Sequence, residues 1–275
     1  MVRGTRMNEP SLNELGPPVD WQGCALDCVA CACHGLLEAD RCRIGHACVF
    51  DRYAKRIDRF FSWNPERARD YLDHPYFEVR AVAAKHVDVF HLPQLIHDPD
   101  ETVRGSAAVR LPPKYLLALV NDQHREVRIR VAARLDPHEL HAMIHDADYY
   151  VRQVVARRIP EGLLILLMHD EDPAVRSAVA SRIGDDWLPG MAHDGEITVR
   201  REVAKRMPPG QLHLLLDDPD WRVRYEVASR AEPNHLRRLA DDEDELVRSL
   251  ARQRLDGDAA GVSRPAKQKQ AFRPF

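Results

Sequence analysis

Six cysteines are the residues whose type and spacing could do chemistry, and they all lie in one short stretch of the chain. They are Cys24, Cys28, Cys31, Cys33, Cys42 and Cys48, and none occurs after Cys48. Thiolates bind zinc and iron–sulfur clusters. Because so short a segment has no apolar core of its own, the crowding predicts a metal or iron–sulfur site in a reducing compartment, not a disulfide framework for the whole chain.

Zinc and an iron–sulfur cluster are the alternatives for this site. Cys28 and Cys31 form a C-x2-C pair, but Cys42 and Cys48 are separated by five residues, and the nearby histidines complete no ordered Cys2His2 pattern. Together with Cys24, the first pair also spells the spacing of radical SAM enzymes, but the chain lacks the barrel that those enzymes need. Irregular spacing and surplus thiols suit a cluster on four thiolates at least as well as zinc.

A sequence repeat without insertions follows the cysteine segment, and its helices must position that segment. The dipeptide Val-Arg recurs every 24 residues, at 79–80, 103–104, 127–128, 151–152, 175–176, 199–200, 223–224 and 247–248. A period of this length indicates stacked helical or strand units, in which each repeat contacts mainly its neighbours.

The apolar pattern inside each repeat predicts two helices of unequal length. With the valine as position 0, apolar residues recur at +4 and +8, and alanine fills +5 from Ala84 to Ala228. These positions form a single stripe on an α-helix of about 9 to 12 residues. Leucine or methionine at +13 and +16 marks a second helix of only about two turns, which favours 3₁₀ geometry. No alternating pattern indicates a sheet.

Charged columns accompany the stripe. An aspartate at +19 (Asp98, Asp122, Asp146, Asp170, Asp194, Asp218, Asp242) is expected to N-cap the next helix. The arginine at +1 lies inside the apolar stripe, so we expect it to pair with the aspartate six residues upstream, as Arg104 with Asp98, in a structural ladder rather than a phosphate groove. A second arginine column at +7 has no matching acid. It predicts helix C-capping or, alternatively, a binding surface.

Composition and motifs narrow the function classes. The 40 Lys and Arg residues against 43 Asp and Glu residues give a net charge of −3, which argues against electrostatically driven nucleic-acid binding as the default. No apolar run reaches the roughly 18 residues of a membrane span, and no secretion signal is recognisable, so we expect a cytoplasmic protein without membrane contact. The repeated His-Asp pairs form a line and not a converging acid–base set. The expected protein is therefore not an enzyme.

The cysteine segment, the stretch CVFDRYAKRIDRFFSWNP and the VRxxVAxRL units followed by LxxL and Asp together resemble the leucine-rich repeat variant proteins, over about residues 20–255. The resemblance implies an all-α, right-handed α-solenoid of alternating α- and 3₁₀ helices. It also implies a small N-terminal domain with a 4Fe–4S cluster on four cysteines, and it supplies no known activity. Our candidates for the ligands are Cys28, Cys31, Cys42 and Cys48, with Cys24 or Cys33 as substitutes.

These features predict a flexible segment 1–20, a cluster domain 21–63 that includes a docking helix, a helical superhelix 64–255 with one degenerate unit and eight repeats, and a flexible tail 256–275. The expected function is a non-enzymatic interaction scaffold for a protein partner, with a cluster that is structural or senses oxygen or redox state. The alternatives are nucleic-acid binding on the +7 arginines and electron transfer. The partner, the binding face and the oligomeric state stay open.

Overall fold

The computed structural model describes residues 16–262, with side chains through Gly257. Every regular element in this range is a helix, and the only strand pairing recorded there is two isolated β-bridges, Val19–Ala25 and Arg43–Ala47. The chain forms two compact units, one ending at Ala142 and the other beginning at Met143. Among the described helices, none combines the length and hydrophobicity that a bilayer span requires.

The first unit contains the cysteine segment and the first repeats. Its helices are α1 (His34–Glu38), α2 (Ala54–Trp63), η1 (Pro65–Tyr71), α3 (Phe77–His86), η2 (Val89–His97), α4 (Glu101–Ala108), α5 (Pro113–Leu116), η3 (Leu117–Leu119) and α6 (Arg125–Arg134). The 3₁₀ helix η4 (Leu140–Met143) follows at the boundary of the two units.

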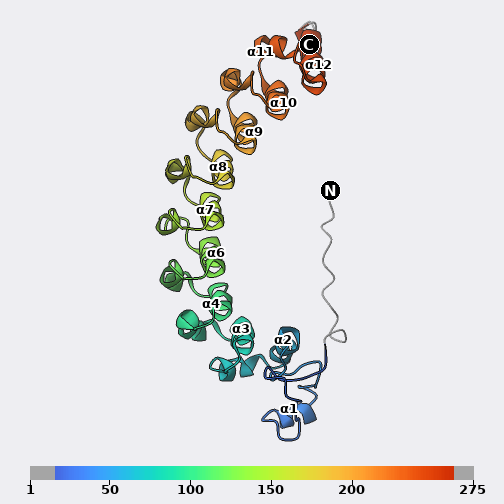
Figure 1. The fold of residues 1–275 in the computed structure, drawn as a ribbon, viewed down its shortest axis with the longest axis vertical. Helices are drawn as coiled ribbons and strands as arrows, with labels where there is room; N and C mark the ends of the chain where they lie inside the picture. The colour runs from blue at the N-terminus through green and yellow to red at the C-terminus, as the bar shows by residue number, and fades with distance from the viewer. Residues whose placement is uncertain (1–15, 263–275) are drawn as a thin grey trace, which may run out of the picture. The chain divides into compact units, whose positions relative to one another are not determined.

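The second unit contains the remaining repeats. Its helices are α7 (Tyr149–Ala156), η5 (Glu161–Leu167), α8 (Pro173–Ala180), η6 (Asp185–Met191), α9 (Ile197–Arg206), η7 (Pro209–Leu215), α10 (Trp221–Arg230), α11 (Pro233–Leu239) and α12 (Glu245–Val262). Within this unit the longer α-helices line up in one layer and the short helices in a second layer (Figure 1).

The two-helix repeat predicted from the sequence is confirmed. In each complete repeat the residues at 0, +4 and +5 of the α-helix, at +8 just beyond it and at +13 and +16 of the short helix are buried, as for Val199, Val203 and Ala204 in α9 and Met207 at its C-cap. The small alanine at +5 lets neighbouring helices approach closely. The short helix is 3₁₀ in most repeats, but α5 and α11 have α-helical geometry.

The N-caps lie two residues later than predicted. Asp100 caps α4 by accepting a hydrogen bond from the amide of Thr102, and Asp148, Asp172 and Asp220 cap α7, α8 and α10 in the same way. The expected cap, the aspartate at +19, instead stabilises the preceding turn. Asp98 Oδ1, for example, accepts from the amide of Asp100 at 2.9 Å.

The arginine at +1 also has a different partner from the one predicted. Arg104 donates from Nε and Nη2 to Asp122, eighteen residues downstream, at 2.7 and 2.9 Å. Asp98, the predicted partner, contributes only its backbone carbonyl, which accepts from Arg104 Nη1 at 2.8 Å. One such arginine with its downstream aspartate is called a rung below. The other rungs that we describe are Arg80–Asp98, Arg152–Asp170, Arg176–Asp194, Arg200–Asp218 and Arg224–Asp242.

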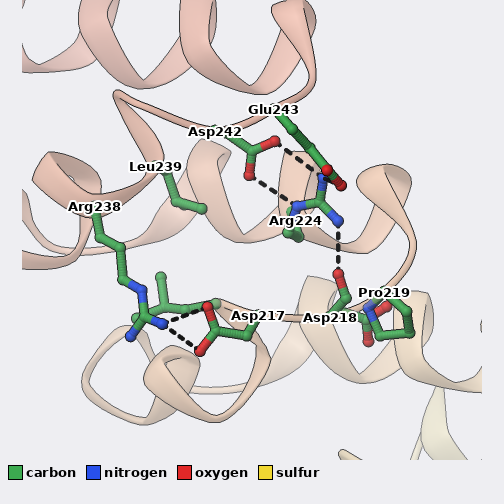
Figure 2. Close-up of a pocket in the computed structure, with 9 residues that line it drawn as sticks. Asp217, Asp218, Pro219, Arg224, Arg238, Leu239, Asp242 and Glu243 are labelled. Carbon is green, nitrogen blue, oxygen red and sulfur yellow. Dashed lines mark hydrogen bonds and ion pairs between the residues drawn. The ribbon is translucent and has the colours of Figure 1, made fainter.

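Figure 2 shows one rung in detail. Arg224 lies between Asp242, which accepts from Nε and Nη2, and the backbone oxygen of Asp218, which accepts from Nη1. Glu243 adds a further contact to Nη2 at 3.1 Å. The arginine therefore joins the loop before its own helix to the loop after its own repeat. This is why it can sit within an apolar stripe.

The arginines at +7 have the structural role that the sequence suggested for them. In α10, Arg230 Nη1 donates to the carbonyl of Ala204 at 2.8 Å, near the C-terminus of the preceding helix α9. Arg110, Arg134, Arg182, Arg206 and Arg254 contact the corresponding carbonyls of the repeats before them. These carbonyls have no partner within their own helix, so the column satisfies them across the repeat interface.

The eighth repeat departs from the pattern in two respects. α12 continues to Val262, past Asp256, where the sequence predicted the tail to begin. Position +5, a buried alanine in the seven preceding repeats, is Arg252, which is exposed and donates from Nε to the carbonyl of Ala240 at 2.8 Å. Residues 1–15 of the predicted N-terminal segment and residues 263–275 of the predicted tail lie outside the described residues.

Candidate metal centre

One tight turn brings the two later cysteines together. Arg43 and Ala47 exchange backbone hydrogen bonds of 2.8 Å around Gly45, whose φ of +69° an L side chain rarely adopts. This turn brings Cys42 and Cys48, on either side of it, close enough for their thiols to form a hydrogen bond with each other. Both cysteines are buried.

A second set of local hydrogen bonds positions the earlier cysteines. The carboxylate of Asp27 accepts from the amides of Val29 and Ala30 at 2.8 and 3.3 Å, which folds the chain between Cys28 and Cys31 into a turn. The ring of His34, at the start of α1, contacts the carbonyl of Cys28 at 2.9 Å. The C-x2-C pair is thereby held against the first turn of α1.

Three of the four predicted ligands line one pocket. Cys28, Cys31 and Cys48 border a cavity of about 310 Å³, together with Trp21 and Phe50. The first two cysteines are partly exposed there, so the cavity opens to solvent. The fourth predicted ligand, Cys42, does not line the cavity but contacts Cys48 directly.

Of the two substitute cysteines, one belongs to this group and the other does not interact with it. Cys33 is buried, and its backbone N–H donates to the sulfur of Cys31 at 3.3 Å. Cys24 is exposed, and its amide bonds the Asp20 carboxylate at 2.7 Å. The structure therefore brings five of the six thiols together.

The electrostatics oppose charge on Cys28, Cys33 and Cys48, whereas the hydrogen bond with Cys48 lowers the pKa of Cys42. Burial raises the pKa of Cys28, and the nearby Cys48 and Cys31 raise it further. For Cys48, the hydrogen bond with Cys42 raises the pKa most, and burial adds to the effect. Several thiolates at this place thus need a positive charge among them, which iron or zinc ions would supply as the protons leave.

A buried ion pair fixes the cysteine group to α2. Asp51 accepts from Arg56 Nη1 at 3.0 Å and from the amide of Tyr53 at 3.0 Å, and both members of the ion pair are buried. The carbonyl of Arg56 in turn accepts from the amide of Cys48 at 3.1 Å. The backbone position of Cys48 therefore depends on this pair.

The donor set fits an iron–sulfur cluster. Five thiols lie near one another in a partly apolar environment, the backbone N–H of Cys33 donates to the sulfur of Cys31, and the hydroxyl of Tyr71 lies against the sulfur of Cys33. Within residues 16–262, no three Cys, His, Asp or Glu side chains are grouped closely enough to hold a single metal ion. Sequence reasoning missed Trp21 and Phe50 as lining residues, because nothing in their spacing relates them to the cysteines.

Comparisons with known proteins found matches for both the cysteine segment and the repeats. A family model described as "LRV protein FeS4 cluster" matches residues 18–70. A solved structure titled "a leucine-rich repeat variant with a novel repetitive protein structural motif" is 44% identical, with a TM-score of 0.80, and the match covers 84% of this chain and 99% of that one.

A curated relative is similar over a shorter range. It is the "uncharacterized 27.7 kDa protein in nifB 3'region" of Rhodobacter capsulatus, 55% identical over 98 residues. The match spans 35% of this chain and 40% of the relative, which is less than half of either protein.

Proposed function

Because the chain belongs to the leucine-rich repeat variant family, we propose that it is a non-enzymatic interaction scaffold whose N-terminal domain binds a 4Fe–4S cluster. The proposed ligands are Cys28, Cys31, Cys42 and Cys48. The observation that carries the proposal is that Cys28, Cys31 and Cys48 line one pocket and Cys42 lies beside Cys48, in the segment matched by the iron–sulfur family model. When bound, the cluster supplies an oxygen-sensitive centre that can accept or donate one electron.

The repeats support the scaffold part of the proposal. The arginines at +1 and +7, the most regular polar side chains of the repeats, are engaged in rungs and helix caps where the structure describes their contacts. The recurring chemistry thus has a structural use, whereas a catalytic site needs acid and base groups that converge. A scaffold of this kind would work in the cytoplasm, where free thiols persist.

Exposed aromatic side chains favour a protein as the partner. Tyr149 and Tyr150 on α7 and Trp221 and Tyr225 on α10 are each about two fifths exposed. Tyrosine and tryptophan are enriched where proteins bind one another, because they bury a large area at a small cost in conformational entropy. Nucleic-acid binding is the weaker alternative, since the +7 arginines already donate to backbone carbonyls.

The first experiment is anaerobic purification followed by iron, sulfide and zinc analysis and an optical spectrum before and after exposure to air. We expect about four iron and four sulfide ions per chain and an absorption that oxygen bleaches. Cys28→Ala should lose the iron, whereas Cys24→Ala is the matched control and should retain it, because Cys24 lies apart from the other thiols. One zinc ion and no sulfide would contradict the proposal.

The sensing version of the proposal needs a second comparison. Once a partner is known, its affinity is measured for iron-loaded protein and for protein from which iron has been removed by a chelator. A sensor requires the two affinities to differ. Equal affinities would leave the cluster with a structural role only.

Electron transfer is a second candidate, because the pocket that Cys28 and Cys31 line opens to solvent. A cluster at such an opening lies close to any protein docked over it. Voltammetry of the loaded protein tests this function. A cluster without a reversible couple would rule it out.

A further inference from the structure

One tyrosine of the degenerate unit reaches the cysteine group from the repeat side. The hydroxyl of Tyr71, at the end of η1, lies 3.3 Å from the sulfur of Cys33. The backbone N–H of Cys33 donates to the sulfur of Cys31, one of the proposed ligands, at 3.3 Å. Two consecutive hydrogen bonds thus connect the sulfur of a proposed ligand to a residue outside the cysteine segment.

The ring of Tyr71 is held from several sides. Its centroid lies 5.6 Å from that of Phe61 and 6.2 Å from those of Phe60, Phe50 and His74, in edge-on or tilted arrangements. Phe60 and Phe61 are fully buried. Because such a packed ring has little freedom to move, a displacement of its hydroxyl is passed on to its neighbours.

The same contacts lead to the first rung of the repeats. His74 packs against Tyr71, and its backbone oxygen accepts from Arg80 Nη1 at 2.7 Å. Arg80 in turn holds Asp98 through Nε and Nη2, at 2.7 and 2.8 Å. A continuous set of contacts therefore runs from the cysteine pocket through Tyr71 to Arg80 in α3.

We propose that Tyr71 is a positioning residue that couples the cysteine site to the first repeat through Cys33. The inference rests on the proposed function, namely that the thiols around the pocket bind a cluster. Binding fixes the sulfur of Cys31, so the Cys33 and Tyr71 contacts are held in one arrangement. The rung of Arg80 becomes more stable as a result. Occupancy of the cysteine site thereby changes the stability of the repeats that would bind a partner.

The test compares Tyr71→Phe with Tyr76→Phe in the full chain. Tyr71→Phe removes only the hydroxyl that reaches Cys33. Tyr76→Phe is the matched control, because it removes a hydroxyl that bonds the carbonyl of Arg52 at 3.1 Å while keeping the ring that stacks on Trp21. Iron and sulfide content and amide hydrogen exchange in α3 are measured for iron-loaded and iron-free protein.

In the unmodified protein and in Tyr76→Phe, loading should slow exchange in α3 by about fivefold, the size of effect that one net hydrogen bond gives. In Tyr71→Phe this difference between loaded and iron-free protein should fall below about twofold, at unchanged iron content. Cys33→Ala, which removes the sulfur and leaves the tyrosine, should reduce the difference in the same way.

The coupling is overturned if Tyr71→Phe keeps the full loading-dependent difference. It is also overturned if Tyr71→Phe speeds exchange equally in loaded and iron-free protein, which would show a packing role only. A wild-type protein that contains neither iron nor sulfide overturns the proposed function itself and the coupling with it. Metal analysis therefore separates the two failures.

Discussion

Arg200 and Asp218, eighteen residues apart, are joined by two hydrogen bonds of 2.7 and 3.1 Å at almost fully buried side chains. Arg200 also donates to the carbonyl of Asp194, six residues before it. One side chain therefore connects the start of its helix to the loop that ends its repeat. Each repeat is closed on itself by this contact, in addition to its apolar core.

Arg200→Ala is expected to lower the free energy of unfolding by about 3 kcal/mol, because it leaves the carboxylate of Asp218 buried without its partner. Lys205→Ala in the same helix is the control. Its ion pair with Glu202 is exposed, so the expected loss is below about 1 kcal/mol. Urea denaturation measures the free energy of unfolding of both variants. Equal losses would show that the rung stabilises the protein no more than an exposed ion pair does.

The rungs should also make the repeats sensitive to acid. Burial acts to raise the pKa of Asp194, but the hydrogen bonds from Arg176 and the Glu196 amide outweigh it, so the pKa lies below its usual value. Asp122 and Asp242 have pKa values lowered in the same way. A carboxyl with a depressed folded pKa contributes stability above its unfolded pKa and loses it as the pH falls through the folded value.

We therefore expect the stability of the protein to fall with decreasing pH below about pH 4, with proton uptake on unfolding. Asp194→Asn should be less stable at neutral pH and lose less stability on acidification. Asp185→Asn, whose ion pair with Arg206 is exposed, should keep the slope of the wild type. Urea titrations between pH 3 and 7 give these slopes, and an unchanged slope in Asp194→Asn would contradict the assignment.

Removal of a +7 arginine is expected to cost less stability than removal of a rung arginine. Arg230→Ala removes the hydrogen bond to the carbonyl of Ala204 and should cost about 1 kcal/mol in thermal or chemical unfolding. Arg222→Ala, in the same helix, loses an exposed pair with Asp220 and should cost less than half of that. If both variants are as stable as the wild type, the +7 arginines are available to bind a ligand, and this result would favour nucleic-acid binding as the function.

The buried pair in the N-terminal domain should control cluster content. Asp51→Ala leaves Arg56 charged and buried, which is expected to destabilise the domain by about 3 kcal/mol or more. Since the backbone carbonyl of Arg56 accepts from the amide of Cys48, iron content should fall as well. Asp70→Ala breaks an exposed pair with Arg67 and should retain full iron. Full iron content in Asp51→Ala would show that cluster binding does not depend on the ion pair.

Much of the fold could be predicted because a strict 24-residue period averages out local ambiguity. The stripe at 0, +4, +5 and +8 specifies the buried face of the α-helix, and the leucines at +13 and +16 specify the short helix. The prediction of the partner of Arg104 was wrong because a periodic sequence places an aspartate both six residues before and eighteen residues after this arginine. Only the path of the chain shows that Asp122 presents its carboxylate and Asp98 its carbonyl.

The cysteine site was predictable as a group but not in its surroundings. Clustered thiols identify the domain, yet their spacing does not show that Cys24 lies apart while Cys33 lies beside Cys31. Tyr71 lies in the degenerate unit that follows the cysteines, and its contact with Cys33 spans 38 residues. No local pattern encodes such a contact. The ring-rich stretch around Phe60 and Phe61 is the only hint that aromatic packing matters there.

Arg252 has a consequence for how this protein can change in evolution. Alanine at +5 keeps a repeat open to another one stacked after it, and the preceding repeats all carry that alanine. The arginine there instead donates to the carbonyl of Ala240 and pairs with Asp241, both in the preceding repeat. Because each rung is completed within 24 residues, duplication or loss of whole repeats upstream of Arg252 would preserve every contact type. The array can thus gain or lose whole repeats without needing any new kind of contact.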